Sequence, residues 1–350
     1  MKIAGVASKF PEHRFDQKEI TDALSAYWGA KLGPRAALLE RLHSRAGVKS
    51  RHLAFPFERY RQFKTWGETN RAWFEAAEEL GAGAIDAALG QAGLTPGDID
   101  ALYVVSITGI ASPSLDARLI NRMGLRPDLK RTPIFGLGCV GGAVGLARAA
   151  DYVLAYPRQI AVLLSVEICS LTMRRDDLTT VNMIATGIFA DGAAAVVVGG
   201  AQRPSVGPEI IDHRSVFYSR TEDIMGWDIS EEGFAIVLSQ KLPTLIRDNL
   251  AGDVDSFLAA HHLTRRDIGS WVFHPGGPKV LEAVEAALDL RERELRLSWE
   301  SLERIGNLSS GSVLCVLEDT MNRHRPPAGT IGLVAAMGPG FCSELILVRW

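Results

Sequence analysis

Short, continuous apolar blocks recur along the whole chain and constrain its fold more than any other feature. They lie at residues 2–7, 101–107, 132–137, 160–168, 192–199, 234–238, 271–273, 313–317, 330–335 and 343–348. Blocks of this length without polar alternation are typical of strands covered on both faces. Helical stretches at residues 74–91, 140–156, 281–290 and 299–305 lie between them. Strands that alternate with helices predict an α/β fold built in layers.

The composition changes at one place. Residues 200–208 are polar and contain glycine and proline, which is typical of a joint between two parts of a chain. A chain of 350 residues usually forms two lobes or one large layered body. We therefore predict an N-terminal half at residues 1–204 and a C-terminal half at residues 205–350.

Charge and hydropathy exclude several classes of protein. The chain is 47% hydrophobic with a net charge of −3, so it is not disordered, and its balanced charge gives no reason to expect a nucleic-acid partner. No apolar run approaches the about 20 residues that a membrane span needs. The N-terminal apolar run is interrupted at Lys9, Pro11 and His13, so it cannot form a signal-peptide core. We expect a cytoplasmic protein without a membrane span.

The cysteines indicate neither a metal site nor a redox pair. Cys139, Cys169, Cys315 and Cys342 form no Cys-x-x-Cys motif. In a reducing compartment we expect free thiols, most of them buried as small apolar side chains.

The densest glycine cluster, residues 135–145, contains the pattern Gly136-x-Gly138-x-x-Gly141 between a predicted strand and a predicted helix. Formally this is a dinucleotide-binding fingerprint. Such a fingerprint normally opens the first βαβ unit and expects an acid about 20 residues on. Here the unit lies in the middle of the chain, and Glu167 comes late. An NAD-dependent oxidoreductase is thus a remote alternative.

Cys139 lies inside this cluster, at the predicted turn from strand to helix. Free N–H groups and the positive partial charge at a helix N-terminus favour thiolate and lower a cysteine pKa. The residues that follow are small, so this helix can approach another backbone closely. These features favour a rigidly held nucleophile, and a buried structural thiol is the alternative.

Two polar residues are candidate partners for such a thiolate. His274 ends the apolar block 271–273 and precedes Pro-Gly-Gly-Pro, so it lies where α/β sheets build their sites. Asn307 lies in a loop of small residues, where it is either a turn residue or an amide donor to a thioester carbonyl. The remaining histidines stand in polar surroundings and are expected at the surface or in turns: His13, His43, His52, His213, His261, His262 and His324.

Five segments in this order resemble the type III polyketide synthases, the chalcone-synthase-like enzymes of the thiolase superfamily. They are Gly138-Cys139 with its small-residue helix, Gly187-Ile-Phe189-Ala-Asp191-Gly192-Ala-Ala, His274-Pro-Gly-Gly-Pro278, Gly306-Asn307-x-Ser309-Ser310 and Gly338-Pro339-Gly340-Phe341. The stretch from Glu167 to Thr172 is similar to the bacterial branch. The resemblance covers essentially the whole chain.

The resemblance implies a five-layer αβαβα fold of two related halves, a homodimer, and catalysis without a metal or a bound cofactor. Cys139 would take a starter acyl group from acyl-CoA. His274 would pair with its thiolate and, with Asn307, hold malonyl-CoA while CO₂ leaves. The resulting enolate would extend the chain in repeated condensations, and a pyrone- or resorcinol-type product would form by cyclisation.

The resemblance also assigns residues around the reaction chamber. Phe189 matches a gatekeeper between the CoA tunnel and the cavity, and Arg41 and Arg45 match residues that meet the CoA phosphates. The cavity lining would include Thr108, Ser112, Cys169, Thr172, Ile236, Gly276 and Gly277. The Ser112-Pro113 segment would reach into the partner's cavity.

The chain also departs from the plant enzymes. Ile236 replaces a second gatekeeper phenylalanine, and Leu38 replaces a third basic CoA contact. An apolar tunnel favours a fatty-acyl or other non-phenylpropanoid starter. The alternatives are a single-condensation enzyme like ketoacyl-ACP synthase III, which the Pro-Gly-Gly after His274 disfavours, and a catalytically silent homologue, which the complete triad disfavours.

Overall fold

A nine-stranded mixed sheet runs through the molecule in this computed structural model, which describes residues 1–291 and 293–350. Its order is β11-β12-β13-β8-β1-β7-β6-β4-β5. The strands are β1 (Lys2–Lys9), β4 (Ala101–Val105), β5 (Lys130–Ile134), β6 (Ile160–Ile168), β7 (Asp191–Gly199), β8 (Glu209–Phe217), β11 (Ile268–Phe273), β12 (Ile331–Gly338) and β13 (Cys342–Arg349). Most predicted apolar blocks are therefore strands of this sheet.

The sheet repeats one pattern of four strands. In β4-β6-β7-β1 the first pair is parallel and the next two pairs are antiparallel, and β11-β12-β13-β8 has the same order and directions. The two copies meet through a single residue pair, Lys2 with Glu209. The predicted relation between the two halves is thus visible in the strand order.

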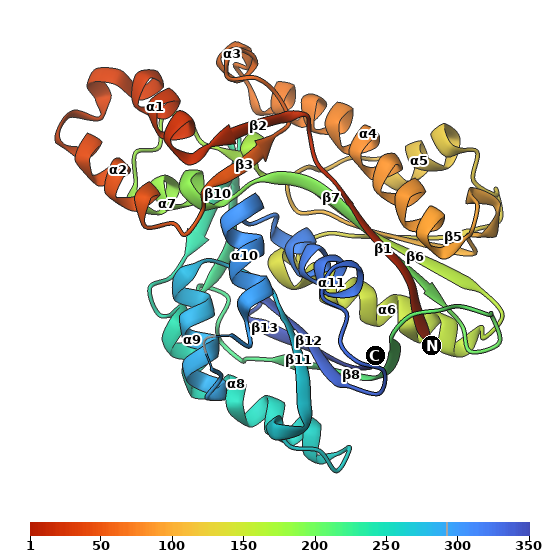
Figure 1. The fold of residues 1–350 in the computed structure, drawn as a ribbon. Coiled ribbons are helices and arrows are strands. Elements are labelled where there is room, and N and C mark those ends of the chain that lie inside the picture. The colour runs from red at the N-terminus through yellow and green to blue at the C-terminus, as the bar shows by residue number, and fades with distance from the viewer. Residues whose placement is uncertain (292) are drawn as a thin grey trace.

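Helices cover both outer faces of the sheet and fill the space between its halves. The outer helices are α4 (Trp66–Ala92) and α5 (Leu115–Met123) on the N-terminal half, and α8 (Leu242–Ala259), α9 (Pro278–Leu288) and α10 (Arg296–Ile305) on the C-terminal half. Between the halves lie α6 (Gly141–Ala155) and α11 (Ser312–Asn322), which pack on strands of both (Figure 1). This arrangement is the five-layer αβαβα fold that the sequence predicts.

One predicted strand is a helix. Residues 313–317 belong to α11, and all five are buried because both halves of the sheet cover this helix. A short apolar block has no period that separates a buried strand from a helix buried on all sides. Conversely, β8 was not predicted, because its side chains from Asp212 to Ser215 are polar and form hydrogen bonds or ion pairs with neighbouring elements.

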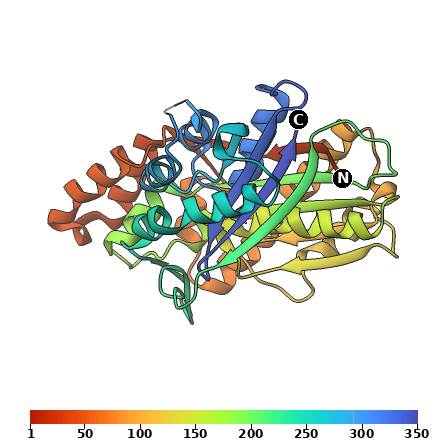
Figure 2. The ribbon, with the colours of Figure 1, turned by 90° about the horizontal axis from the view of Figure 1, so that it is seen from below.

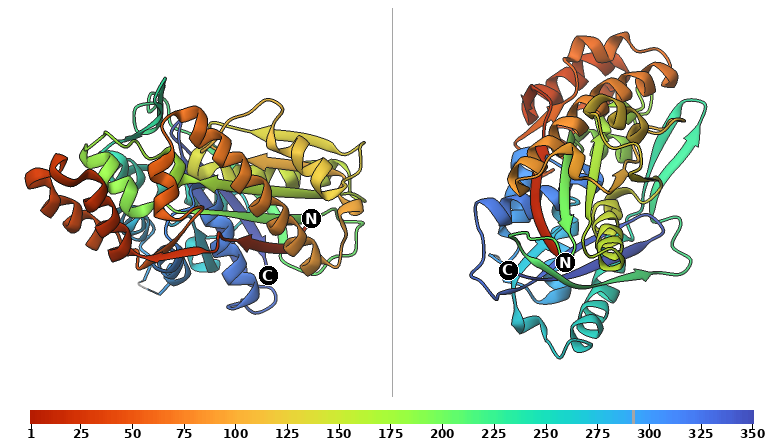
Figure 3. Two further views of the ribbon diagram at one scale, coloured as in Figure 1. Left: turned by 90° about the horizontal axis from the view of Figure 1, so that it is seen from above. Right: turned by 90° about the vertical axis from the view of Figure 1, so that its right-hand side faces the viewer.

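Shorter elements gather at one end of the molecule, and several of them share a separate core that includes Ile20, Leu24, Trp28, Leu39 and Met183. They are β2 (His13–Asp16), α1 (Gln17–Trp28), α2 (Ala36–Ser44), β3 (Ser50–Leu53), α3 (Phe57–Gln62), the turn η5 (Cys169–Thr172), α7 (Thr180–Ile188) and the hairpin of β9 (Met225–Ser230) and β10 (Gly233–Leu238). Figures 2 and 3 show α1 and α2 projecting at the end opposite the two chain termini, which lie close together. In residues 1–291 and 293–350, no helix combines the length and apolar character needed to cross a membrane.

Candidate active site

Cys139 lies in the short turn η4 (Gly138–Val140) that leads into α6. The turn begins at Gly138, which has a φ of +51°, and a Cβ there would lie 2.7 Å from Cδ of Pro339. Only glycine fits this position without strain. The Cys139 side chain is buried, and its Sγ lies 3.8 Å from Oγ of Ser309. The sequence prediction of a rigidly held cysteine at a tight turn agrees with this geometry.

The Asn307 side chain is held in one orientation. Its Oδ1 accepts hydrogen bonds from the backbone N–H of Ser309 (2.7 Å) and from the hydroxyl of Ser312 (3.2 Å). Its Nδ2 donates to the carbonyl of Gly276 (3.1 Å). An amide nitrogen has two hydrogens, so the second hydrogen of Nδ2 remains as a donor of fixed direction.

The backbone of Asn307 fixes this donor relative to the segment that contains Phe189, the gatekeeper assigned by resemblance. Its N–H donates to the carbonyl of Ile188 (2.9 Å), and its own carbonyl accepts from Ala190 (2.9 Å). Phe189 and Asn307 thus form a parallel β-bridge. Residues far apart in the sequence are fixed relative to each other by main-chain bonds, which do not depend on side-chain rotamers.

His274 follows the end of β11, and its backbone N–H donates to Ala335 (3.0 Å). Its side chain is 6% exposed, and within the described residues neither ring nitrogen has a hydrogen-bond partner. A Cβ on Gly276 would lie 3.4 Å from Nε2 of His274. Because the Gly276 carbonyl also binds Asn307, this glycine stands next to both candidate oxyanion donors.

Burial dominates the titration of both reacting groups. It raises the pKa of Cys139 to about 12, and hydrogen bonds from Ser309 and Asn307 offset only part of that rise. It also lowers the pKa of His274 to about 3. Burial thus opposes the lowering of the cysteine pKa that the helix terminus predicts. A thiolate here needs a countercharge, and moving the thiol proton to His274 would create one.

Glu167 is a buried carboxyl, considered from the sequence as the acid of the dinucleotide fingerprint and as the first residue of a segment similar to the bacterial branch. It lies near the end of β6 and accepts hydrogen bonds from Oγ1 of Thr108 (2.9 Å), the N–H of Ile107 (3.0 Å) and the hydroxyl of Ser310. Burial raises its pKa to about 7. An acid inside the otherwise apolar block 160–168 was the available signal. Glu167 therefore connects Thr108, beyond the end of β4, with Ser310 in the turn that precedes α11.

Two cavities meet at this site. The first, which we call the chamber, contains Cys139 and has a volume of about 50 Å³. Its walls are mainly apolar, and such walls limit the access of water to the Cys139 side chain. It is lined by Ile107, Thr108, Gly138, Cys139, Cys169, Phe189, Met225, Gly226, Trp227, Ile236, Val237, Leu238, Ser309 and Pro339.

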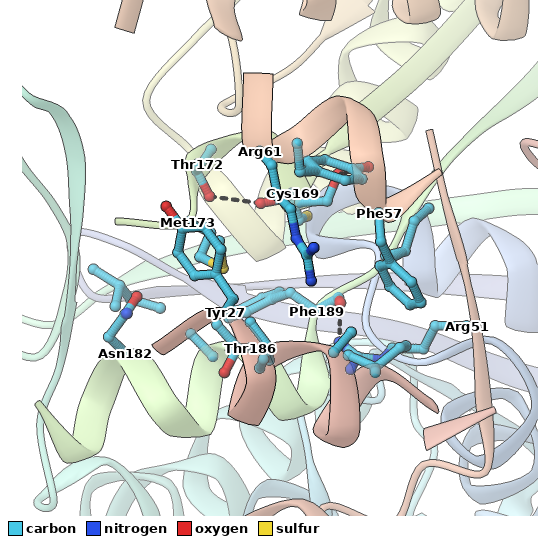
Figure 4. Close-up of a pocket in the computed structure, with 18 of the residues that line it drawn as sticks. Tyr27, Arg51, Phe57, Arg61, Cys169, Thr172, Met173, Asn182, Thr186 and Phe189 are labelled. Carbon is cyan, nitrogen blue, oxygen red and sulfur yellow. Dashed lines mark hydrogen bonds between the residues drawn. The ribbon is translucent and has the colours of Figure 1, made fainter. Parts of the chain in front are cut away.

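The second, which we call the lateral cavity, has a volume of about 110 Å³ and lies among α1, α3, η5 and α7 (Figure 4). It shares the residues Cys169, Phe189, Trp227 and Ile236 with the chamber. These four side chains form the boundary between the two cavities. The gatekeeper assigned by resemblance, Phe189, and its aliphatic counterpart, Ile236, both belong to this boundary.

The other predicted cavity residues divide into three groups. Thr108 and Cys169 line the chamber, and Thr172 lines the lateral cavity. Gly276 and Gly277 line neither, and they form the turn between His274 and α9. Ser112 is exposed and lines neither cavity of its own chain. Its place in a cavity lining therefore stays a prediction, which the resemblance directs toward the partner's cavity.

Arg41 and Arg45 lie at the C-terminal end of α2, and both are exposed. Between them His43 is buried, contrary to the prediction, and its ring nitrogens contact Thr21 (2.9 Å) and Thr186 (3.3 Å). Burial lowers the pKa of His43 to about 4. His43 packs α2 against α1 and α7, whereas the two arginines remain available to an anionic ligand.

Sequence reasoning also missed the buried Arg51 beside this cavity boundary. It donates to the carbonyl of Phe189 (2.6 Å) and to Oε1 of Gln17 (3.0 Å). In the sequence, Arg51 was recognisable only as a single arginine within the short strand β3. In the described part of the chain, no group of three or more His, Cys, Asp or Glu side chains could hold a metal ion.

Comparisons with known proteins agree with this geometry. The family model "Chalcone and stilbene synthases, N-terminal domain" matches residues 4–202, and the corresponding C-terminal model matches residues 210–350. A 1,3,6,8-tetrahydroxynaphthalene synthase of Streptomyces peucetius subsp. caesius is 50% identical over 99% of this chain and 93% of its own length. A putative chalcone synthase of Bacillus subtilis is 37% identical over 87% of this chain and 86% of its own.

Solved structures show the same likeness. The 1,3,6,8-tetrahydroxynaphthalene synthase of Streptomyces coelicolor, described as a bacterial type III polyketide synthase, superposes with a TM-score of 0.93 at 30% identity, covering 100% of this chain and 99% of that one. PKS-I of the brown alga Ectocarpus siliculosus superposes with a TM-score of 0.92 at 33% identity, covering 99% and 97% of the two chains.

Proposed function

Because this chain belongs to the chalcone and stilbene synthase family of type III polyketide synthases, we propose that Cys139, His274 and Asn307 carry out its decarboxylative condensation. In the loading step, His274 takes the Cys139 proton and the thiolate attacks the carbonyl of an acyl-CoA. CoA leaves as its sulfur takes the proton back from His274, and a thioester to Cys139 remains.

In the extension step, His274 and Nδ2 of Asn307 donate hydrogen bonds to the thioester oxygen of malonyl-CoA. The bond to the carboxylate breaks, CO₂ leaves, and its electron pair becomes the enolate. The enolate carbon attacks the acyl thioester on Cys139 and displaces the thiolate. Decarboxylation itself generates the carbanion, so this chemistry needs no carboxylate base and no bound cofactor.

One observation carries this assignment best. The Nδ2 donor of Asn307 is held by the Oδ1 bonds described above, and the buried ring nitrogens of His274 have no hydrogen-bond partner among the residues that the structure describes. Buried polar groups are nearly always paired, so an unpartnered ring beside a fixed amide donor fits a site made for an oxyanion. Donors that are already oriented cost little reorganisation when charge develops.

Helix termini support the same charge distribution. Cys139 precedes α6, and Asn307 and Ser309 precede α11, so two long helices begin at the site. Their free N–H groups carry positive partial charge toward a thiolate or an enolate. This field favours the anionic states of the reaction at Cys139.

For substrates, we propose malonyl-CoA as both starter and extender. The support is the high identity to a 1,3,6,8-tetrahydroxynaphthalene synthase. In 1,3,6,8-tetrahydroxynaphthalene every carbon atom lies in the two rings, and the four hydroxyl groups stand on alternating carbons. An alkyl starter would leave a side chain on the rings, which this product does not have. Incubation with ¹⁴C-malonyl-CoA alone tests this, and we expect a labelled polyhydroxynaphthalene.

A second candidate keeps the starter expected from the sequence. The lateral cavity adds mainly apolar volume beyond Phe189 and Ile236, which would suit a fatty-acyl chain and a pyrone or resorcinol product. A panel of acyl-CoAs with malonyl-CoA separates the candidates. Faster turnover with long acyl starters than with malonyl-CoA alone would favour this second product class. Strict dependence on acyl carrier protein would contradict both.

We assign the CoA phosphates to Arg41 and Arg45. Both are exposed, and neither forms an ion pair with a described residue. Two unpaired guanidinium groups on one helix end suit a phosphate-rich ligand. Replacing both with glutamine should raise KM for malonyl-CoA about tenfold and leave kcat nearly unchanged, and an unchanged KM would remove this assignment.

We also propose a homodimer. Strand β5 is an exposed edge of the large sheet. Nζ of Lys130 on this strand lies over the ring of Tyr156, 3.7 Å from the ring centroid. Ile110 and Phe135, which follow the neighbouring strands β4 and β5, are 45% and 44% exposed. Exposed edges and apolar patches are typical of interfaces. Light scattering should give about twice the 38.0 kDa chain mass, and a monomer would contradict this.

A cytoplasmic location is our inference from the chemistry. CoA thioesters are made inside cells, and the four cysteines, including the nucleophile, are unpaired. A reducing compartment keeps such thiols reduced. Cell fractionation would test this inference.

A further inference from the structure

The lateral cavity is basic although most of its wall is apolar. Its lining contains two arginines, Arg51 and Arg61, and no aspartate or glutamate. A pocket for a purely aliphatic chain has no use for an exposed guanidinium group such as that of Arg61, because this group loses hydration as the pocket fills. The charge in this wall therefore points to a ligand with an anionic group.

Arg51 forms the inner part of this wall. Its side chain is 2% exposed, and its Nε has no hydrogen-bond partner among the described residues. The nearby carboxylate of Asp191 is occupied by the N–H groups of Ala54 (2.7 Å) and Ser170 (2.8 Å). Arg51 and Asp191 interact electrostatically without a direct ion pair in the described chain, so the carboxylate offsets only part of the positive potential that Arg51 contributes to the cavity.

Arg61 forms the outer part. It lies near the end of α3, and Figure 4 shows its side chain pointing into the cavity between Cys169 and Phe57. Among the residues that the structure describes, its guanidinium has no ion pair and no hydrogen bond. Arg59 on the same helix differs, because it pairs with Glu75 at 2.6 Å and lies over the ring of Phe55.

The lateral cavity adjoins the nucleophile's chamber. Cys169, Phe189, Trp227 and Ile236 line both cavities, so an acyl chain on Cys139 that passes this boundary enters the lateral cavity. Apolar side chains of α1 such as Ile20 and Leu24 would contact the chain's carbon atoms. Arg61 would then meet whatever group ends the chain.

We propose that the lateral cavity binds the distal end of the acyl chain on Cys139, and that Arg61 selects chains ending in a carboxylate. The ligand class is an acyl thioester with a free terminal carboxyl group. The inference rests on the proposed function and deepens it, since a starter loaded from malonyl-CoA without loss of CO₂ carries such a carboxylate. A guanidinium binds a carboxylate with two parallel charge-assisted hydrogen bonds, which a terminal methyl group cannot form.

The test compares matched starters. Each ω-carboxyacyl-CoA (malonyl, glutaryl, adipyl, suberyl) is paired with a monoacyl partner, which is the alkanoyl-CoA of the same carbon number that ends in a methyl group. Loading on Cys139 is followed by intact-protein mass spectrometry. In the wild type we expect the carboxylated member to load faster in at least one pair. In Arg61→Gln that preference should fall about tenfold, while loading of the monoacyl partner stays the same or rises.

Arg59→Gln is the control, because it removes a charge from the same helix outside the cavity. It should leave the preference unchanged, and thermal melting checks that both variants are folded. If Arg61→Gln keeps the wild-type preference in every pair, or if both variants change it equally, the inference is overturned. These results are independent of the proposed function, which fails instead if the wild-type enzyme makes no polyketide from malonyl-CoA.

Discussion

Gly142 on α6 lies directly against the carbonyl oxygen of Ser310 in the turn η7 (Ser309–Gly311) that leads into α11, and a Cβ on Gly142 would come within 2.1 Å of that oxygen. The two central helices therefore begin in contact, one carrying Cys139 and the other following Asn307 and Ser309. Their contact sets the spacing between the nucleophile and the Asn307 segment. Small residues after Cys139, such as Gly142, allow this close contact between the two helix starts.

Replacing Gly142 with alanine should push these two helix starts apart. Overpacking a filled core costs about 1–3 kcal/mol, so we expect urea unfolding to show a loss in that range. Condensation should fall by more than tenfold, because Cys139 and Ser309 move relative to each other. Gly90→Ala on α4 is the matched control, since a Cβ there meets nothing within 4 Å. It should stabilise the protein by about 0.5–1 kcal/mol.

His274→Gln should slow alkylation of Cys139 by iodoacetamide about tenfold or more at pH 7. Without the imidazole, burial keeps the pKa of the thiol near its raised value of about 12. The thiolate fraction, and with it the rate, should then rise about tenfold per pH unit between pH 7 and pH 10. A variant that alkylates as fast as wild type at pH 7 would show that His274 does not accept the thiol proton.

His213 links the two halves of the molecule at a distance from the active site. It contacts Asp151 of α6 (2.8 Å) and Glu344 of β13 (3.6 Å). The hydrogen bond to Glu344, opposed by burial and assisted by Asp151, raises its pKa above 6.5. A raised pKa means that this stabilisation is complete below pH 6.5 and is lost as pH rises through the folded-state value.

His213→Gln should therefore lower the free energy of unfolding by about 1–2 kcal/mol at pH 6, and the difference from wild type should shrink toward pH 9. Urea unfolding of both proteins across this pH range measures it. A difference that grows with pH would contradict the assigned protonation.

Ile236→Phe should block the boundary between the chamber and the lateral cavity. Ile236 lines both, so a larger ring there shortens the space open to a growing chain. We expect shorter products at the expense of the longest one, measured by liquid chromatography and mass spectrometry. Ile229→Phe on the same hairpin is the control, because Ile229 is 55% exposed and lines neither cavity. An unchanged product pattern in Ile236→Phe would show that the chain does not pass this boundary.

Local sequence patterns predicted much of the fold and of the candidate site. The apolar blocks identified most strands of the large sheet, and the local contexts of Cys139, His274 and Asn307 predicted the candidate site. Each residue stands at the end of an apolar block or in a loop of small residues, and such positions follow from nearby residues alone. The family resemblance supplied the roles and the five layers.

Long-range contacts explain what the sequence did not show. Residues 313–317 form a helix because sheet covers them on both sides, and His43 is buried because α1 and α7 pack on it. The positions of Arg51 and Glu167 depend on contacts between distant segments. Arg51 donates to the carbonyl of Phe189, and Glu167 accepts hydrogen bonds from Thr108 and Ser310. The pKa of Cys139 likewise depends on burial by distant segments.

The Cys139→Ala variant tests the central claim most directly. Wild-type and variant enzyme are incubated with ¹⁴C-malonyl-CoA, and acyl adducts, CO₂ release and products are measured together. We predict no adduct on the protein and no polyketide from the variant, with some malonyl-CoA decarboxylation remaining because His274 and Asn307 are intact. Polyketide formation near the wild-type rate would contradict the covalent mechanism at Cys139.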